Sequence, residues 1–427
     1  MSDVSCSSTS VRSGPSSGGL LALLVLLNLF NYIDRYNLPP VLAPIEREFQ
    51  ATGSQMGFLA TGFLVVYMLT APLFGWMADR YSRWALVGIG MLIQSLGTLG
   101  SGLAESYLVL LIARCVVGIG DAAYGPAAPT IISDLYPIEK RGRKLAWFYA
   151  AMPVGSAVGF AIGGGMRELT GSWRWGFYSI VPPMILLGII CLLIRDRRIN
   201  RGVAQPVVHQ KIRFKDYLSL SKNRSYLLNC LGMTLMTFAI GGVSFWMPYY
   251  LEEARGISKS ASSIGFGLIV VIAGLSATLA GGYWGDRLKP RFSGSYFWVS
   301  GIGMLTAVPL IGLMLVTPFP ACWVVIFLAV FVLFLNTGPS NTILANVTSP
   351  RIRASAFALN IFIIHALGDA ISPPIIGWFK DRWSFDAAFL LLMGVVGLSG
   401  IVWCIGARYL LSDTWNEEPS QGIARNA

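Results

Sequence analysis

Several charged residues lie inside stretches of sequence that are largely apolar, and three of them are candidates for proton binding. Asp34 interrupts the run 20–46, and Arg114 and Asp121 lie within the run 107–135. A charged side chain at the centre of a membrane helix costs about 2.5–3.5 kcal/mol even on the lenient insertion scale, so these groups should face a protein cavity or a partner charge. Burial favours the neutral form of an acid and a nearby arginine favours its ionised form. This combination suits groups that bind and release protons.

The spacing of the three residues predicts that they lie at similar depths in the membrane. Arg114 and Asp121 are seven residues apart, so they share one helix face about 10 Å apart along the axis. In a hydrocarbon core of about 30 Å, Asp34 and Arg114 fall at the same depth when counted from opposite membrane surfaces. Where the spans that carry Asp34 and Arg114 are neighbours, Arg114 can pair with Asp34 or with Asp121, but hardly with both at full strength. The alternative is a static ion network that only holds two helices together.

Other polar and aromatic side chains in apolar runs are candidates for a substrate cavity. Trp246 and Tyr249 fit an interfacial aromatic belt as well as an outer gate. His365 and Asp369 are i and i+4 on one helix, but no third ligand of a usual type suggests zinc, so we expect a packing histidine or a pH-responsive group. The candidate cavity set is Asn31, Tyr32, Arg35, Tyr124, Trp246, Tyr249, Asn336, Asn341, Asn360 and His365.

The elements that position these residues are predicted to be membrane helices. Of the 427 residues, 54% are apolar and only 12% are charged, against roughly 25% charged in soluble domains. Apolar runs of about 20 residues recur from end to end, which is typical of an all-α polytopic membrane protein. We predict twelve spans, at 20–41, 55–78, 84–103, 107–135, 144–166, 175–195, 225–250, 261–285, 295–317, 321–348, 353–379 and 386–411.

The net charge of +11 is distributed as a topology signal and does not indicate nucleic-acid binding. With the N-terminus in the cytoplasm, about 23 Lys and Arg fall on that side and about 7 on the other, so both termini are predicted to be cytoplasmic. The predicted organisation is a disordered tail (1–18), a six-helix bundle (19–195), a basic cytoplasmic linker (196–222), a second six-helix bundle (223–412) and a C-terminal tail (413–427).

A short Gly-x-x-x-acid pattern ends the middle helix of each group of three spans. Its copies are Gly75 to Asp79, Gly164 to Glu168, Gly282 to Asp286 and Gly377 to Asp381. Copies two and four emerge on the opposite side from copies one and three, as inverted three-helix repeats within two six-helix halves would produce. The glycine allows close helix approach, and the acid can bond a neighbouring helix N-terminus or a loop arginine.

Twelve spans, a basic linker and Gly75-x-x-x-Asp79-Arg80-x-x-Arg83 resemble the major facilitator superfamily. The usual motif has Gly where this chain has Ser82 and a second basic residue where it has Trp84. The resemblance covers residues 19 to 412 and implies the major facilitator fold, in which spans one and four pack together around the central cavity. The residues that we assign to gates are Gly75, Asp79, Arg80, Arg83, Asp286, Arg287 and Asp369.

A set of more specific sequence motifs resembles the Spinster family of lipid transporters. It comprises Asn31-Tyr32-x-Asp34-Arg35, Arg114-x-x-x-Gly118-x-Gly120-acid-Ala122, and His365-x-x-Gly368-Asp369-x-x-Ser372-Pro373. The family usually has Glu where this chain has Asp121. The resemblance implies proton-coupled transport of lysophospholipids or sphingoid lipids by alternating access, with Asp34, Arg114 and Asp121 as the coupling residues.

Two other transport functions stay open, namely an organic-anion/proton symporter and an uncoupled lipid scramblase. An enzyme is not expected, because the sequence has no catalytic triad, no metal cluster and no phosphate-binding glycine loop. We expect no cofactor beyond a proton gradient, an amphipathic lipid as the binding partner, and a monomer. The expected location is the plasma membrane, or the inner membrane in a bacterium.

Overall fold

The computed structural model describes residues 16–194, 220–349 and 352–415, and in these ranges the chain is helical throughout. The first half comprises α1 (Ser17–Asn37), η1 (Pro39–Val41), α2 (Leu42–Phe49), α3 (Gly53–Arg80), α4 (Arg83–Leu103), α5 (Tyr107–Leu135), α6 (Ile138–Thr170) and α7 (Arg174–Leu193). Twelve helices in the described ranges are long and apolar enough to cross a membrane, so the predicted number of spans is confirmed.

The second half repeats this plan with broken helices. It comprises α9 (Arg224–Glu253), α10 (Lys259–Leu288), α11 (Ser295–Val316), α12 (Cys322–Phe334), α13 (Thr337–Val347), α14 (Arg353–Ile364), the π-helical turn η3 (His365–Asp369), α15 (Ser372–Arg382), α16 (Phe385–Gly406) and α17 (Leu410–Asp413). Predicted span ten is therefore α12 followed by α13, and predicted span eleven is α14, η3 and α15.

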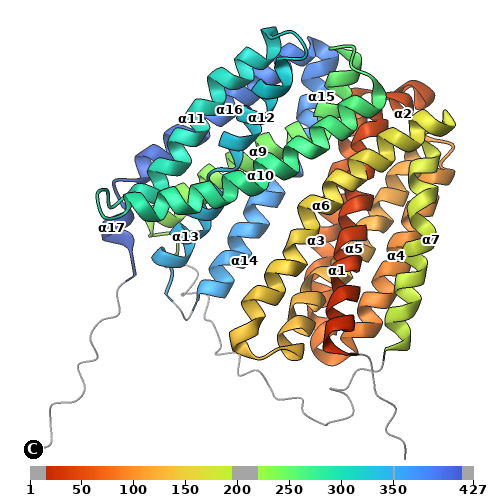
Figure 1. Cartoon of the computed structure of the whole chain (residues 1–427), viewed down its shortest axis with the longest axis horizontal. Coiled ribbons are helices and arrows are strands. Elements are labelled where there is room, and N and C mark those ends of the chain that lie inside the picture. Colours follow the sequence, from red (N-terminus) through yellow and green to blue (C-terminus); the bar gives the residue numbers. More distant parts are fainter. Residues whose placement is uncertain (1–15, 195–219, 350–351, 416–427) are drawn as a thin grey trace, which may run out of the picture.

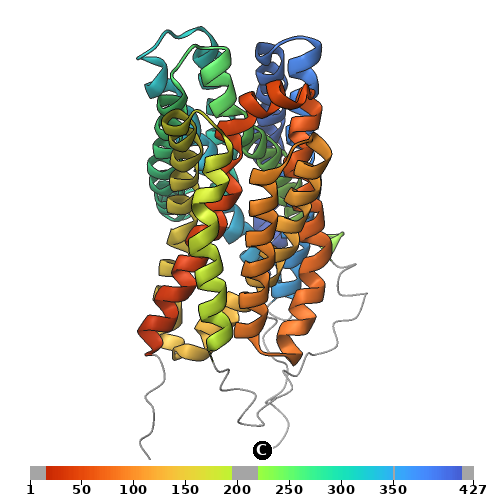
Figure 2. The same ribbon diagram turned by 90° about the vertical axis from the view of Figure 1, so that its right-hand side faces the viewer.

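The two halves form two bundles that stand side by side (Figure 1). We call the end where α1 begins the inner end, and the opposite end, which carries α2, the outer end. Figure 2 shows the N-terminal bundle in front of the C-terminal bundle. α6 packs against α10 and α3 packs against α15, and these two helix pairs form the most extensive contacts between the bundles.

Local sequence signals explain where the helices begin and end. Thr52 and Gln55 form a capping box at the start of α3, and the Asn223 side chain caps α9. Gly171 follows α6 with φ 73°, a backbone conformation that favours glycine. Pro39 and Pro40 end α1 because proline lacks the amide hydrogen that an α-helix needs.

Both predicted tails contribute residues to the bundles, which moves two of the predicted boundaries. Helix α1 already begins at Ser17, with the Ser16 side chain as its cap, inside the predicted tail 1–18. At the other end, the Asp413 carboxylate accepts a hydrogen bond of 2.7 Å from the Ser225 amide at the start of α9. Residues 196–219 of the predicted linker lie outside the described residues.

The apolar core differs between the inner and outer halves of the molecule. One hydrophobic cluster continues from the N-terminal bundle into the C-terminal bundle, where Phe160 on α6 meets Phe266 on α10 with ring centroids 5.5 Å apart. A second cluster, which includes Leu24, Trp84 and Phe148, is confined to the N-terminal bundle. The bundles therefore share a core in the outer half.

Glycine residues let α6 lie directly against α1. A Cβ added at Gly155 would come within 2.7 Å of the Leu29 carbonyl oxygen, and one added at Gly159 within 2.6 Å of that of Ile33. Glycine at these two positions therefore allows the membrane helices to pack at short range. This close packing against α6 fixes the position of α1, the helix that carries Asp34.

Candidate functional site

Asp34 and Arg114 meet in the interior of the N-terminal bundle, as their predicted depths require. The Arg114 Nη1 lies 3.6 Å from the Asp34 Oδ1, and the side chains are 2% and 0% exposed. Gln94 on α4 donates a hydrogen bond of 3.1 Å to the other carboxylate oxygen of Asp34. Three helices thus converge on one buried carboxylate.

The pair is held by charge more than by hydrogen bonds. Nε and Nη1 of Arg114 and Oδ1 of Asp34 have no hydrogen-bond partner among the described residues. The Arg114 guanidinium also lies 5.6 Å from the centre of the Phe63 ring. Buried polar groups are normally satisfied, and exceptions call for an explanation. The Asp34–Arg114 pair therefore keeps unused hydrogen-bonding capacity.

Asp121 lies two helical turns beyond Arg114 on α5 and is partly exposed. Within the part of the chain that the structure describes, no ion pair or hydrogen bond joins it to Arg114. Arg114 therefore pairs with one of the two candidate acids. The other acid remains available on the same helix face.

Arg35 faces the C-terminal bundle and not its sequence neighbour Asp34. Its Nη2 lies 3.9 Å from the Asp369 Oδ2, and its guanidinium lies 5.2 Å from the centre of the Phe63 ring. His365 Nδ1 lies 2.9 Å and 3.0 Å from the two Asp369 oxygens, so the predicted i, i+4 contact is present. Both residues belong to η3, a π-helical turn of the kind that often occurs at functional sites.

A pocket lies between the bundles at this level. Arg35, Arg114 and Phe63 line it from the N-terminal bundle, and Ser244, Phe245 and Asp369 line it from the C-terminal bundle. Two guanidinium groups and aromatic rings therefore share one cavity. We call it the apical pocket. Such a lining suits a ligand with an anionic group and an apolar part.

Several residues predicted to line a cavity lie inside one bundle instead. Tyr124 donates a hydrogen bond of 2.7 Å to the Leu24 carbonyl and is 4% exposed. Asn336 donates to the Leu333 carbonyl at 2.6 Å, and the Asn360 amide nitrogen lies 3.5 Å from Met233 Sδ. These three side chains lie within a bundle, although the side-chain oxygens of Asn336 and Asn360 have no hydrogen-bond partner among the described residues.

The remaining predicted cavity residues differ in exposure. Asn31 is 4% exposed, and its amide has no hydrogen-bond partner among the described residues. Tyr32 is half-buried and stacks on Tyr36 with ring centroids 6.3 Å apart. Asn341 is exposed and donates to the Thr337 carbonyl at 2.8 Å.

Trp246 and Tyr249 belong to the outer end. Their rings lie 5.6 Å and 4.9 Å from Lys380 Nζ, and Trp246 Nε1 donates to the Pro373 carbonyl at 2.9 Å. Lys380 in turn pairs with Glu46 of the N-terminal bundle. The two aromatic residues therefore support a contact between the bundles at the outer end.

The predicted inner gate residues make contacts within their own bundle. Arg83 is 8% exposed and donates a hydrogen bond of 2.8 Å to Asp134. The Arg80 guanidinium lies 4.2 Å from the centre of the Trp76 ring on the same helix. Trp76 directly follows Gly75 in the sequence. The side chain of Asp79 lies outside the described residues. In the second bundle, Asp286 accepts a hydrogen bond of 2.8 Å from Tyr296, and Arg287 donates one of 3.1 Å to Tyr283.

In the described ranges, no group of three or more His, Cys, Asp or Glu residues is placed to hold a metal ion. The functional groups gathered at the centre are instead one buried ion pair, one partly exposed acid and a pocket with two guanidinium groups. Sequence reasoning missed Gln94 as a partner of Asp34. An amide in the middle of an apolar span was the available signal.

The fold and the site together define a class of protein, the two-bundle membrane transporters. The model of the Major Facilitator Superfamily matches residues 24–373. A bacterial homologue of the human lysosomal transporter Spinster, solved in an inward-facing and occupied conformation, has a similar fold with a TM-score of 0.83. It is 21% identical, and the match covers 95% of this chain and 100% of that one.

Sequence relatives make the assignment more specific. Protein spinster homolog 3 of Danio rerio is 32% identical over 425 residues, which cover 92% of this chain and 85% of that protein. The sphingosine-1-phosphate transporter SPNS2 of Danio rerio is 32% identical over 419 residues, which cover 90% and 83%. The chain belongs to the spinster family within the major facilitator superfamily. It is a multi-pass membrane transporter and not an enzyme.

Proposed function

We propose that this protein is a proton-coupled transporter that moves amphipathic lipids, of the lysophospholipid or sphingoid type, by alternating access. It needs no cofactor beyond the proton gradient and acts as a monomer in the plasma membrane, or in the inner membrane of a bacterium. The observation that carries the proposal is the buried Asp34–Arg114 pair beside the apical pocket, with Asp121 two turns away.

Proton coupling follows from the competition for one arginine. Protonation neutralises Asp34 and removes the charge that holds Arg114, so Arg114 can turn to Asp121 or to an anionic ligand. Release of the proton restores the Asp34–Arg114 pair. Gln94 donates to the ionised form of Asp34 and thereby adjusts the pH at which this exchange occurs.

The lipid class is supported by the lining of the apical pocket. Arg35 and Arg114 offer two cationic groups, and Phe63 and Phe245 offer apolar surface in the same cavity. An anionic head group followed by the start of an apolar chain matches both features, and the cavity volume of about 70 Å³ admits only this part of a lipid. SPNS2, which is named as a sphingosine-1-phosphate transporter, carries a substrate of this kind.

Reconstitution in liposomes tests the proposal. Lysophospholipid flux is measured with and without an imposed pH gradient for wild type, for Asp34→Asn and for Asp386→Asn, which changes an exposed acid at the start of α16 in the same way. We expect gradient-driven flux in wild type and Asp386→Asn, and its loss in Asp34→Asn. Flux without response to the gradient would favour a scramblase. Flux of sugar acids but not of lysolipids would favour an organic-anion symporter.

A further inference from the structure

The outer copies of the Gly-x-x-x-acid pattern carry a base directly before the acid, and the inner copies do not. The outer copies read Gly164-x-x-Arg167-Glu168 and Gly377-x-x-Lys380-Asp381. The inner copies have the small residues Ala78 and Gly285 at the position of the base. A repeat that gains a base only on one side of the membrane suggests a separate task on that side.

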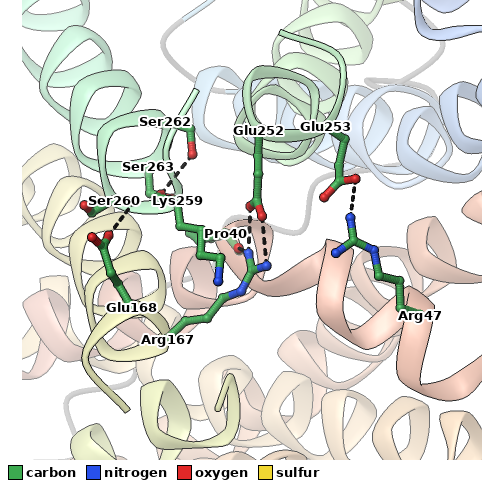
Figure 3. Close-up of polar contacts among 10 residues, drawn as sticks. All are labelled: Pro40, Arg47, Arg167, Glu168, Glu252, Glu253, Lys259, Ser260, Ser262 and Ser263. Carbon is green, nitrogen blue, oxygen red and sulfur yellow. Dashed lines mark hydrogen bonds and ion pairs between the residues drawn. The ribbon is translucent and has the colours of Figure 1, made fainter. Parts of the chain in front are cut away.

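The first outer copy connects α6 to both ends of the α9–α10 loop. Arg167, which is 5% exposed, donates hydrogen bonds of 2.6 Å and 2.8 Å to the two carboxylate oxygens of Glu252 at the end of α9. Glu168 accepts a hydrogen bond of 3.1 Å from the Ser260 amide in the first turn of α10. Figure 3 shows the two side chains diverging from α6 toward these partners.

The second outer copy repeats this arrangement with the bundles exchanged. Lys380 on α15 pairs with Glu46 on α2, which follows α1, and the two side chains are 11% and 14% exposed. Asp381 accepts a hydrogen bond of 2.6 Å from the Gly53 amide at the start of α3, and also lies 3.3 Å from Lys380. An acid at a helix N-terminus meets free amide hydrogens and the positive end of the helix dipole.

The glycine of each copy allows the close approach that these contacts need. A Cβ added at Gly164 would come within 2.6 Å of Ser263 Oγ on α10, and one added at Gly377 within 2.2 Å of the Gly53 carbonyl oxygen on α3. Each copy therefore places its base and its acid directly against the opposite bundle.

We propose that Arg167-Glu168 and Lys380-Asp381 form a pair of symmetry-related clasps that set how readily the outer side opens during transport. In each clasp the base pairs with an acid at or beyond the end of the first helix of the facing repeat, and the acid of the clasp caps the second helix. Opening of the outer side has to break both contacts of each clasp. The four residues are positioning residues for the transport cycle, and the inference rests on the alternating access proposed above.

Thiol labelling from the outside tests the clasps without any substrate. Ala60 lines the apical pocket, below the clasps. An Ala60→Cys variant in sealed, right-side-out vesicles is exposed to a membrane-impermeant maleimide, with the chain that retains Ala60 as background. We expect Arg167→Ala or Lys380→Met to raise the labelling rate at position 60 about tenfold, because each leaves a buried acid without its partner.

A matched control is available at the same end of the molecule. Arg47 pairs with Glu253 across the bundles but its side chain is 63% exposed, so Arg47→Ala should change the rate less than about twofold. The exchange Arg167→Glu with Glu252→Arg should restore the wild-type rate. The double variant Arg167→Ala, Lys380→Met should show roughly the product of the single effects, since the clasps share no partner.

Three results would overturn the clasps. The first is a rate in Arg167→Ala equal to that of wild type or of Arg47→Ala, and the second is a charge exchange that fails to restore the rate. The third is a parallel rise in labelling of the buried Cys191 and Cys230, which would mean general loosening of the bundles. Labelling does not depend on lipid flux, so absence of lipid transport would refute the proposed substrate and leave this test valid.

Discussion

A buried amide in the C-terminal bundle and a buried ion pair in the N-terminal bundle use their hydrogen-bonding groups in different ways. In the C-terminal bundle, Asn229 donates a hydrogen bond of 3.0 Å to the Ser340 carbonyl and accepts one of 3.0 Å from Trp403 Nε1, so both ends of its amide are used. In the N-terminal bundle, Asp34 and Arg114 lie 3.6 Å apart and each leaves polar atoms without a hydrogen bond in the described ranges.

This difference separates a fixed contact from an exchangeable one. A neutral, satisfied amide gains nothing from a change of proton concentration. A buried charge pair has an energy that depends on protonation, and its spare hydrogen-bonding capacity permits a second partner. The Asp34–Arg114 pair is therefore where we expect protons to be sensed, whereas Asn229 holds helices of the C-terminal bundle together.

The largest expected effect comes from removing the cation of the pair. Arg114→Met should lower the free energy of unfolding by about 3–5 kcal/mol, because it leaves the Asp34 carboxylate buried without a partner. Adding Asp34→Asn to the same chain should recover a large part of this loss. Thermal unfolding of the single and double variants in detergent measures the coupling between the two residues. Equal losses in Arg114→Met and in the double variant would contradict the pairing.

The amide of Asn229, whose hydrogen bonds are satisfied, provides a test in a residue that we expect to affect stability and not coupling. Asn229→Ala should lower the free energy of unfolding by about 1–3 kcal/mol, because it leaves the Trp403 indole and the Ser340 carbonyl without their partner. The pH dependence of transport should stay as in wild type. A shifted pH profile in this variant would mean that the C-terminal bundle also takes part in coupling.

The amide beside Asp34 should affect coupling more than stability. Gln94→Leu removes a hydrogen bond that favours the ionised carboxylate, so half-maximal transport should move to higher pH, by about one unit. Lipid flux as a function of pH in liposomes measures this shift. An unchanged or downward-shifted midpoint would show that Gln94 does not act on Asp34.

The smallest effect is expected from an exposed pair. Arg47→Ala should change the free energy of unfolding by less than about 1 kcal/mol, since solvent screens its contact with Glu253. Thermal unfolding under the same conditions as for Arg114→Met provides the comparison. A loss as large as that of Arg114→Met would remove the distinction between buried and exposed pairs.

The sequence was sufficient to predict the twelve spans and the meeting of Asp34 with Arg114. The spans follow from their length, and the common depth of Asp34 and Arg114 follows from the rise per residue. That the two spans are neighbours was implied by the resemblance to the major facilitator superfamily, and Asp121 stayed open as the other partner of Arg114. The contact between His365 and Asp369 was predictable because it lies within one helix.

Contacts that depend on how a helix is rotated against its neighbours were not predictable. Arg35 turns to Asp369 in the other bundle, and Tyr124 and Asn336 turn into the interior of their own. A polar residue in an apolar span satisfies its hydrogen bonds equally well in a bundle interior or at a cavity wall. The sequence pattern alone does not distinguish these positions.

Proton movement linked to lipid is the most direct test of the central claim, that the Asp34–Arg114 pair couples transport to protons. In liposomes that contain a pH-sensitive dye, added lysophospholipid should drive proton flux through wild type. In Asp34→Asn this flux should be absent, while exchange of labelled for unlabelled lysolipid continues. Lipid-driven proton flux that persists in Asp34→Asn would contradict the account.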